Sequence, residues 1–410
     1  MKACLIIFFT FQMCVGYATT HHAGQGQHYE TIREALDAAQ DGDTVIVHPG
    51  NYLEGNLIID KSIVFLGLDM PVLDGQKKFE VLSVKADNVV IEGFIIQHSG
   101  HSSMEDLGGI KVYDSRNVTI TRNRLKENFF GIYLQYSKNC IISNNVVMAS
   151  AEEEQQIGNG IHCWKSDSLR IIGNQISGHR DGIYFEFVTG SIIWRNTSVG
   201  NIRYGLHFMF SNNDAYITNI FKNNGAGVAV MFTKNVKMFN NTFIDNWGDA
   251  AYGLLLKEIS DSHIFNNRFV NNTSGIYMEG TNRVICEKNI FKDNGWGMKI
   301  QASCMDNEIR WNNFQRNTFD VTTNGSLILN KFENNYWDKY EGYDINRDDI
   351  GDIPYRPLSL FSVIVEKYPP VMILYRSFIV TLLDRSEKII PTLTPSNFVD
   401  DAPVMQAITL

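Results

Sequence analysis

Two side chains that could hold a metal ion stand two residues apart near the middle of the chain. His207 and Met209 lie in the stretch GLHFMF, residues 205–210. If this stretch is a β-strand, its alternation places His207 and Met209 on one face and the apolar residues around them on the other. Imidazole and thioether together form a soft ligand set, which prefers Cu(I) to hard cations. Further ligands would have to come from elements that lie beside this strand.

A glycine repeat indicates what those elements are. Nine glycines recur along the chain, and six of their eight intervals are 22 or 23 residues long: Gly109, Gly131, Gly160, Gly182, Gly205, Gly227, Gly253, Gly275 and Gly297. A fixed period of this length is typical of a solenoid, in which each repeat stacks on the next. The residues one and three positions after each glycine are apolar, which indicates a strand with one buried face.

An asparagine repeat supports the same stacking. Eight asparagines follow the glycines at fourteen residues and a ninth follows at fifteen: Asn123, Asn145, Asn174, Asn196, Asn219, Asn241, Asn267, Asn289 and Asn312. Amides at one corner of every coil can hydrogen-bond to their copies above and below. Short strands in units of this size predict an all-β fold, a right-handed parallel β-helix of the pectin-lyase-like kind, with an N-terminal capping helix and a C-terminal helical tail.

Five segments follow one another in this scheme. They are a signal peptide over residues 1–18, an N-terminal segment with the capping helix over 19–43, the β-helix over 44–335, an Asp-rich loop over 336–357 and the helical tail over 358–410. The signal peptide is predicted because Lys2 precedes an apolar run too short for a membrane span, and small residues precede a cleavage site after Ala18. It implies export from the cytoplasm.

The tail and the Asp-rich loop each leave two interpretations open. Residues 371–390 are predicted to form one helix, whose apolar surface should dock on the end of the solenoid or on a partner at the membrane. In the loop, four residues alternate as in a calcium loop: Asp344, Asn346, Asp348 and Asp352. The pattern departs from an EF-hand because Asp349 stands where Gly is needed and no Glu closes the loop. A weak calcium site and an ordinary Asx-rich turn both fit.

Two outward-facing columns of side chains are expected to gather the candidate copper ligands. Two residues after the glycines stand His162 and His207, and four residues after them stand Glu186, Met209 and Met231. Neighbouring coils lie about 4.8 Å apart, and residues i and i+2 on a strand about 6.7 Å apart. One Cu(I) ion could therefore be reached by His207, Met209, Met231 and Glu186. His162 lies two coils away from His207 and is too far to join them without a movement of its side chain. An exposed stripe of aromatic and Met side chains is also typical of a protein-docking surface.

Charge and carboxylate placement restrict the other classes of function. The net charge of -9, with no basic cluster, argues against nucleic acid as a partner. A carbohydrate-binding or polysaccharide-modifying protein (lyase, hydrolase or epimerase) is the alternative, because such enzymes are common on this fold. Their chemistry requires paired carboxylates or a base beside cations, but Glu186 and Glu279 stand four coils apart. We therefore predict that the protein is not an enzyme.

The coils, followed by NNYWDKYEGYD, GDIPYRP, VEKYPP and LTPSNFVDDAPVM, resemble the NosD family from about residue 29 to 406. The resemblance implies a periplasmic maturation factor for nitrous oxide reductase, the terminal enzyme of denitrification. It implies work with an ABC transporter, made of a permease and an ATPase, and with a copper-chaperone lipoprotein. The implied role is to receive copper from the chaperone, hold it transiently as Cu(I), and help deliver it to the apo-reductase. The tail helix becomes a candidate contact with the permease, which would associate the protein with the membrane.

Overall fold

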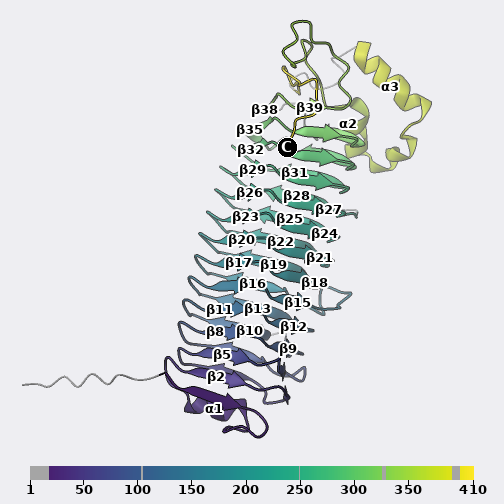
Figure 1. Ribbon diagram of the computed structural model, residues 1–410. Coiled ribbons are helices and arrows are strands. Elements are labelled where there is room, and N and C mark those ends of the chain that lie inside the picture. The colour runs from purple at the N-terminus through teal and green to yellow at the C-terminus, as the bar shows by residue number, and fades with distance from the viewer. Residues whose placement is uncertain (1–17, 103–104, 249, 326–328, 390–397) are drawn as a thin grey trace, which may run out of the picture.

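Three parallel sheets wind around one core to form a long solenoid (Figure 1). The computed structural model describes residues 18–102, 105–248, 250–325, 329–389 and 398–410; the predicted signal peptide thus lies almost wholly outside the described residues. Each regular coil gives one strand to each sheet, and each strand pairs in parallel with its equivalent in the next coil. The predicted all-β parallel β-helix is confirmed.

The strands belong to sheets that we call A, B and C. Sheet A contains β1 (Thr20–Ala23), β2 (Thr44–Val47), β5 (Val64–Gly67), β8 (Val90–Glu92), β11 (Thr119–Thr121), β14 (Ile141–Ser143), β17 (Arg170–Ile172), β20 (Ile192–Trp194), β23 (Ala215–Ile217), β26 (Lys237–Phe239), β29 (His263–Phe265), β32 (Ile285–Glu287), β35 (Met305–Arg310) and β38 (Leu329–Glu333). Sheet B contains β3 (Asn51–Tyr52), β6 (Val72–Asp74), β9 (Ile95–Gln97), β12 (Arg124–Lys126), β15 (Val146–Met148), β18 (Gln175–Ser177), β21 (Thr197–Val199), β24 (Ile220–Lys222), β27 (Thr242–Ile244), β30 (Arg268–Val270), β33 (Ile290–Lys292), β36 (Asn313–Gln315) and β39 (Tyr336–Trp337). Sheet C contains β4 (Leu57–Ile59), β7 (Leu82–Val84), β10 (Gly108–Tyr113), β13 (Phe130–Gln135), β16 (Ile161–Trp164), β19 (Asp181–Glu186), β22 (Tyr204–Met209), β25 (Ala226–Met231), β28 (Tyr252–Lys257), β31 (Ser274–Glu279), β34 (Trp296–Ile300) and β37 (Phe319–Thr322).

The repeated glycine is required by close approach between coils on sheet C. A Cβ atom on Gly131 would lie 2.4 Å from the carbonyl oxygen of Gly160, and one on Gly205 would lie 2.7 Å from that of Gly227. Both distances are shorter than van der Waals contact, so a side chain here would push neighbouring coils apart. The glycines thereby keep the strands of sheet C in register with each other.

Apolar side chains from every coil stack into columns in the core. One column of six aromatic rings continues to the last coil, with centroids 4.2 to 5.5 Å apart: Phe221, Phe243, Phe269, Phe291, Phe314 and Trp337. These rings are completely or almost completely buried. Stacked rings gain contact energy beyond their area burial, so the same pattern in successive repeats stabilises the register of the coils.

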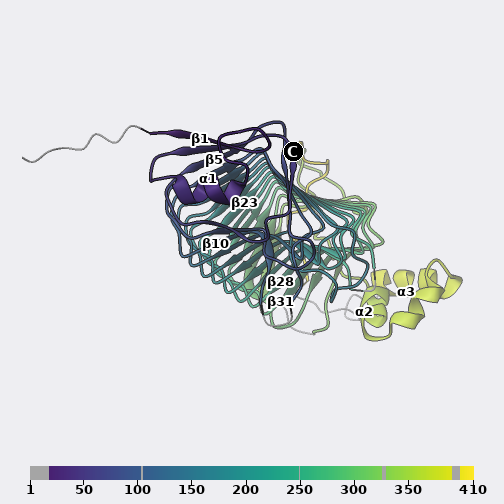
Figure 2. The same ribbon diagram turned by 90° about the horizontal axis from the view of Figure 1, so that it is seen from below.

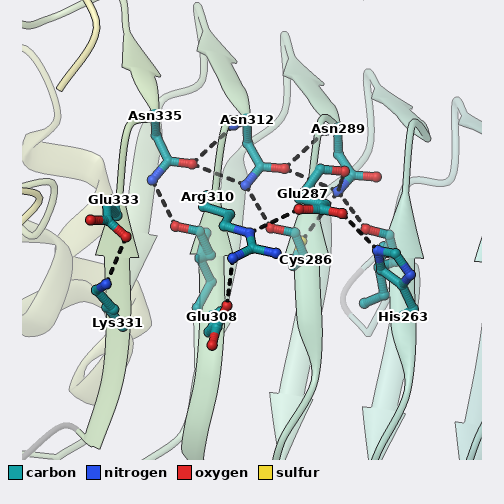
Figure 3. Close-up of polar contacts among 12 residues, drawn as sticks. His263, Cys286, Glu287, Asn289, Glu308, Arg310, Asn312, Lys331, Glu333 and Asn335 are labelled. Carbon is teal, nitrogen blue, oxygen red and sulfur yellow. Dashed lines mark hydrogen bonds and ion pairs between the residues drawn. The ribbon is translucent and has the colours of Figure 1, made fainter. Parts of the chain in front are cut away.

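The predicted asparagine ladder lines one inner corner of the solenoid (Figure 3). The backbone and side-chain amides of Asn289 donate to Oδ1 of Asn312, at 2.9 and 3.0 Å, and those of Asn312 donate to Oδ1 of Asn335. Each side chain also donates to a carbonyl oxygen, as Asn312 does to Cys286. The ladder therefore satisfies buried backbone groups that the turns would leave without partners.

The N-terminal end is closed by helix α1 (Ile32–Ala38), which lies across the first coils (Figure 2). Thr31 and Glu34 form a capping box at its start. Ile32, Ala35 and Leu36 are buried against the core. The helix thus covers the apolar end that the first coil would otherwise expose.

The C-terminal tail contains three short helices and an extended return. The helices are α2 (Leu360–Lys367), η1 (Pro369–Leu374) and α3 (Phe378–Ile389), and the last two replace the single helix predicted over 371–390. The chain turns between η1 and α3, where Arg376 has a positive φ of 64°. Helix α2 packs on β37 through Phe361 and Phe319, and Lys299 pairs with Glu366 at 2.9 Å. Among the described residues, no helix is long and apolar enough to cross a membrane.

The last described residues, 398–410, lie beyond these helices, return to the solenoid and contain no helix. Asp400 is fully buried, and its carboxylate accepts hydrogen bonds from the backbone amide and side chain of Asn335 and from the indole of Trp337, all at 3.0 Å. The amide of Val404 donates to the carbonyl of Asn335. A carboxylate from far along the chain thus terminates the asparagine ladder.

Candidate metal-binding face on sheet C

Strands β19, β22 and β25 place the candidate copper ligands side by side. Their register pairs Glu186 with Met209 and Met209 with Met231 in successive coils. His207 precedes Met209 by two residues on β22, so it lies on the same face of the sheet. His162 pairs with Tyr184, and Tyr184 with His207, so the two histidines are two coils apart as predicted.

The prediction that both histidines are exposed is wrong. His162 is 8% exposed and His207 is 6% exposed. The ring of His162 lies between those of Tyr133 and Tyr184, with centroids 4.4 and 4.8 Å away. Burial lowers the pKa of His162 to about 3, with a smaller effect from the nearby Arg180. The outward face of sheet C is therefore covered at these positions by large aromatic neighbours.

A buried carboxylate that sequence reasoning missed orients His207. Oδ2 of Asp181 lies 3.4 Å from Nδ1 of His207, and Oδ1 lies 3.9 Å from Nε of Arg203. Asp181 is 1% exposed and directly precedes the repeated glycine of its coil. The equivalent residues of the other coils that carry the repeated glycine are uncharged, as Tyr204 and Ala226 are. A single charged residue in this column is the feature of the sequence that could have identified Asp181.

This contact leaves the second ring nitrogen of His207 available as a ligand. Because Asp181 accepts at Nδ1, the proton belongs on Nδ1 and the lone pair on Nε2. Nε2 is buried and has no hydrogen-bond partner among the residues that the structure describes. A carboxylate behind the ring opposite the metal is the arrangement that orients histidine ligands in metal sites. Within the described part of the chain, the Nε2 of His162 is likewise buried without a partner, but its Nδ1 faces the side-chain amide of Asn159 and not a carboxylate.

The other three candidate residues lie at a more open margin of the face. Glu186, Met209 and Met231 are half-buried and follow one another at the ends of their strands. Among the described residues, no three His, Cys, Asp or Glu side chains gather as metal ligands. A site on this face that uses the thioethers would suit a soft ion such as Cu(I) rather than zinc.

A histidine on another face shows the contrasting arrangement. Nε2 of His263 on sheet A donates to Oε1 of Glu287 at 3.0 Å, and the other oxygen of that carboxylate accepts from Nε of Arg310 at 2.8 Å (Figure 3). Its ring nitrogen is engaged in this surface network. His263 is therefore the histidine with which we compare the candidate ligands on sheet C.

The Asp-rich loop has the contacts of an Asx-rich turn. Both carboxylate oxygens of Asp344 accept backbone amides of the loop, including those of Arg347 and Asp349. Asp352 accepts from the amide of Ile345, and the side chains of Asn346 and Asp348 bond to each other at 2.9 Å. These bonds satisfy the side chains within the turn itself, so the geometry favours the turn over the weak calcium site.

Comparison with known proteins adds a family to this geometry. The family model described as "Periplasmic copper-binding protein (NosD)" matches residues 148–348, which include every candidate copper ligand. A "Probable ABC transporter binding protein NosD" from Pseudomonas aeruginosa is 27% identical over 91% of this chain and 91% of its own length. The protein of the same name from Stutzerimonas stutzeri is 26% identical over 91% of this chain and 89% of its own.

These matches support assignment of the chain to the NosD family. The N-terminal part, residues 40–158, also matches a general model of right-handed β-helix regions. Among solved structures, the chain is similar to the A-module of the mannuronan C-5 epimerase AlgE6 of Azotobacter vinelandii, with a TM-score of 0.50 and 16% identity over 74% of this chain and 84% of that one. It is also similar to the Dettilon tailspike protein, with a TM-score of 0.57 and 13% identity over 73% of this chain and 66% of that one. At these identities the likeness shows the fold alone.

Proposed function

We propose that this NosD-family protein is a periplasmic accessory protein of an ABC transporter complex that matures nitrous oxide reductase. It receives copper from a chaperone lipoprotein and helps to deliver it to the apo-reductase. ATP hydrolysis belongs to the ATPase subunit of the transporter, so this chain itself is not an enzyme. The observation that carries the proposal is His207, backed by Asp181 and with a free Nε2, beside the paired thioethers of Met209 and Met231.

The copper in this proposal is cargo, held as Cu(I) by a thioether-rich set. Met209 and Met231 are register partners, and Glu186 continues the same column. The ring of His207 lies against those of Tyr184 and Tyr204, at 4.8 Å each. A small displacement of these rings would bring Nε2 toward the thioethers. A weak, partly covered site suits an ion that must leave again, because tight preorganised coordination would retain it.

Replacing all three central ligands is expected to abolish maturation. In the variant H207N/M209L/M231L, leucine nearly keeps the volume of methionine and asparagine keeps a polar donor beside Asp181, so the coils should remain folded. Cells that express it should accumulate reductase without copper, as measured by metal analysis of the purified enzyme. M148L/M305L, which changes two exposed methionines on other strands, is the matched control and should support normal loading. Normal copper content of the reductase with the triple variant would contradict the proposal.

The helical tail is the proposed contact with the permease. Its helices expose Ile373 at 89%, Phe378 at 80%, Ile379 at 56% and Leu382 at 53%. Apolar side chains this exposed and this close in sequence are typical of an interface rather than of a solvated surface. Truncation of the tail would also remove Asp400 and open the last coil, so surface substitutions give the cleaner test.

The variant F378S/I379S/L382S is expected to keep the fold and to lose binding to the permease of the transporter. Co-purification of the tagged chain with the permease from membranes should fall at least about tenfold, because several buried apolar contacts are lost together. The exposed pair T381S/R385K on the same helix is the control and should retain binding. Unchanged co-purification of the triple variant would show that the tail does not hold the permease.

A polysaccharide-modifying activity is the second candidate, favoured by one observation. Asp181, His207 and Tyr184 bring a carboxylate-backed base next to a phenol, and Arg203 adds a cation. Burial raises the pKa of Tyr184 to about 12. However, a base must reach its substrate, and a sugar polymer needs a far wider opening to the buried Nε2 of His207 than the single ion that a small ring displacement would admit. Release of unsaturated products from a panel of uronate polymers would establish this activity in place of the copper role.

A further inference from the structure

Three phenylalanines form an exposed ladder beside the paired methionines. Phe187, Phe210 and Phe232 directly follow the column of Glu186, Met209 and Met231, in the turns that leave sheet C. Their exposures are 44%, 39% and 39%. Neighbouring rings stack at 5.1 and 5.0 Å with interplanar angles of 9° and 16°. We call these three residues the Phe ladder.

The backbone at the Phe ladder gives no reason for phenylalanine. The three residues have φ angles of 53°, 51° and 54°, in the left-handed region that disfavours bulky side chains. The turn imposes this conformation in eight successive coils, at Asp114, Tyr136, Lys165, Phe187, Phe210, Phe232, Glu258 and Gly280. The turn thus accepts charged, aromatic and glycine residues alike and does not itself call for phenylalanine. Three successive phenylalanines at strained, exposed positions therefore indicate a function outside the fold.

The stacking geometry restricts what can bind there. Each ring covers its neighbour's face, so the central ring presents its edge to solvent. Sugars and bases are recognised through the faces of aromatic rings, and the inner faces of this ladder are occupied. Ring edges instead favour thioether sulfur, which contacts aromatic rings at about 5 Å and often at the edge.

The charges around the Phe ladder, and its position beside the two methionines, further restrict the kind of partner that could bind there. The Phe ladder and the two methionines carry no charge, and charged residues bound them at Lys165 and Glu186 on one side and at Lys257 and Glu258 on the other. A matching partner surface is therefore uncharged at its centre with charges around it. The ladder also borders Met209 and Met231, so a partner seated on it lies within reach of the ion that they are proposed to hold.

We propose that the Phe ladder docks an uncharged, methionine-bearing segment of the protein that exchanges copper with this chain. Sulfur atoms of the segment contact the ring edges and hold its own thioether ligands beside Met209 and Met231. Copper can then pass between two thioether sets without release to water. This inference rests on the proposed copper role, but docking itself needs no copper.

Binding of a copper-free peptide to the intact chain tests the inference. The probe is a dye-labelled synthetic peptide with four Met residues and neutral spacers, and its counterpart has norleucine for each Met, which replaces sulfur by a methylene group. Fluorescence anisotropy with a copper chelator present reports the affinity. F187N/F210N/F232N removes the ladder, and Asn suits the left-handed backbone. K165N/E258N changes the same turn position in the two flanking coils and is the matched control.

The Met peptide should bind the wild-type chain several-fold more tightly than the norleucine peptide. The ladder variant should lose at least about tenfold in affinity for the Met peptide, and the control variant should keep it. Melting temperatures should show that the ladder variant is folded; F210N, which removes only the central ring, gives the same test if it is not. Equal affinity for the two peptides, or unchanged affinity of the ladder variant, would overturn the inference. Cu(I) affinity of the same variants without peptide reports on the proposed copper site separately.

Discussion

His162 and Asp214 show how burial controls ionisable side chains inside this solenoid. Burial lowers the pKa of His162 to about 3, so the folded protein resists protonation of this ring and loses stability as the pH falls below about 6.5. Asp214 behaves in the opposite sense. Burial raises its pKa to about 8, although its Oδ1 accepts from the amide of Ser191. The folded protein therefore holds a proton that the unfolded chain releases near pH 4, and stability is lost as the pH rises from about 4 through 8.

D214N is expected to stabilise the protein, and more so at alkaline pH. Asn307 occupies the equivalent position in a later coil and makes the same contact to a backbone amide, while its own amide donates to a carbonyl. Asn therefore fits this site without the cost of burying a charge. The gain at pH 8.5 should be on the order of a few kcal/mol and should shrink toward pH 5. Thermal melts of both proteins at the two pH values measure it.

D167N provides a control of opposite sign. Hydrogen bonds from Ser168 and Thr189 lower the pKa of Asp167, so its charge stabilises the fold above its ordinary pKa and ceases to do so as the pH falls below it. This variant should be slightly destabilised at pH 8.5. If each substitution changed the melting temperature by the same amount at pH 5 and at pH 8.5, burial of the Asp214 charge would not be the cause of the lost stability.

At the residue scale, the sequence predicted where the candidate ligands lie on the sheet better than it predicted how exposed they are. The period placed Glu186, Met209 and Met231 in one column, as the strand register shows. It could not predict that His207 is covered, because the cover comes from Tyr184 and Tyr204, whose ring orientations are set by packing. Asp181 was missed for a related reason: it belongs to no repeated column, and only its contact with His207 gives it a role.

At the scale of elements, the asparagine ladder joins the coils into one hydrogen-bonded corner. Its regular part follows from the repeat, since each amide meets the next coil at the same place. Its end does not follow, because Asp400 lies 65 residues beyond Asn335 in sequence and outside the period. The capping helix α1 could be predicted from its amphipathic pattern, whereas the break between η1 and α3 depends on local packing of the tail.

D400A is expected to loosen the last coil and leave the middle of the solenoid intact. Removing this buried carboxylate strands the amides of Asn335 and the indole of Trp337, at a cost of about 3 kcal/mol or more. Because a solenoid coil contacts only its neighbours, hydrogen exchange should accelerate in β38 and β39 but not in β22. D401A, at the exposed neighbouring position, should leave exchange unchanged. Faster exchange throughout the solenoid would contradict this local role.

At the scale of the whole molecule, the three proposed roles lie at different places along one axis. The middle coils carry the candidate metal-binding face, and the Phe ladder lies along its margin. The tail helices project from the far end (Figure 1). The period and the apolar columns were sufficient to predict the solenoid, because every coil repeats the same contacts. The tail occurs once in the chain and the Phe ladder occupies only three successive coils, so the repeat does not report their structure. The proposed contacts with other proteins lie at these positions.

The central claim is that the middle coils hold Cu(I), and an anaerobic Cu(I) titration against a competing chelator tests it most directly. The intact wild-type chain should withdraw one Cu(I) from the chelator. H207N/M209L/M231L should bind at least about a hundredfold more weakly, since three ligands are lost, while H263N, on the sheet A network, should bind as the wild type does. Equal Cu(I) affinity of the triple variant and the wild-type chain would contradict the claim.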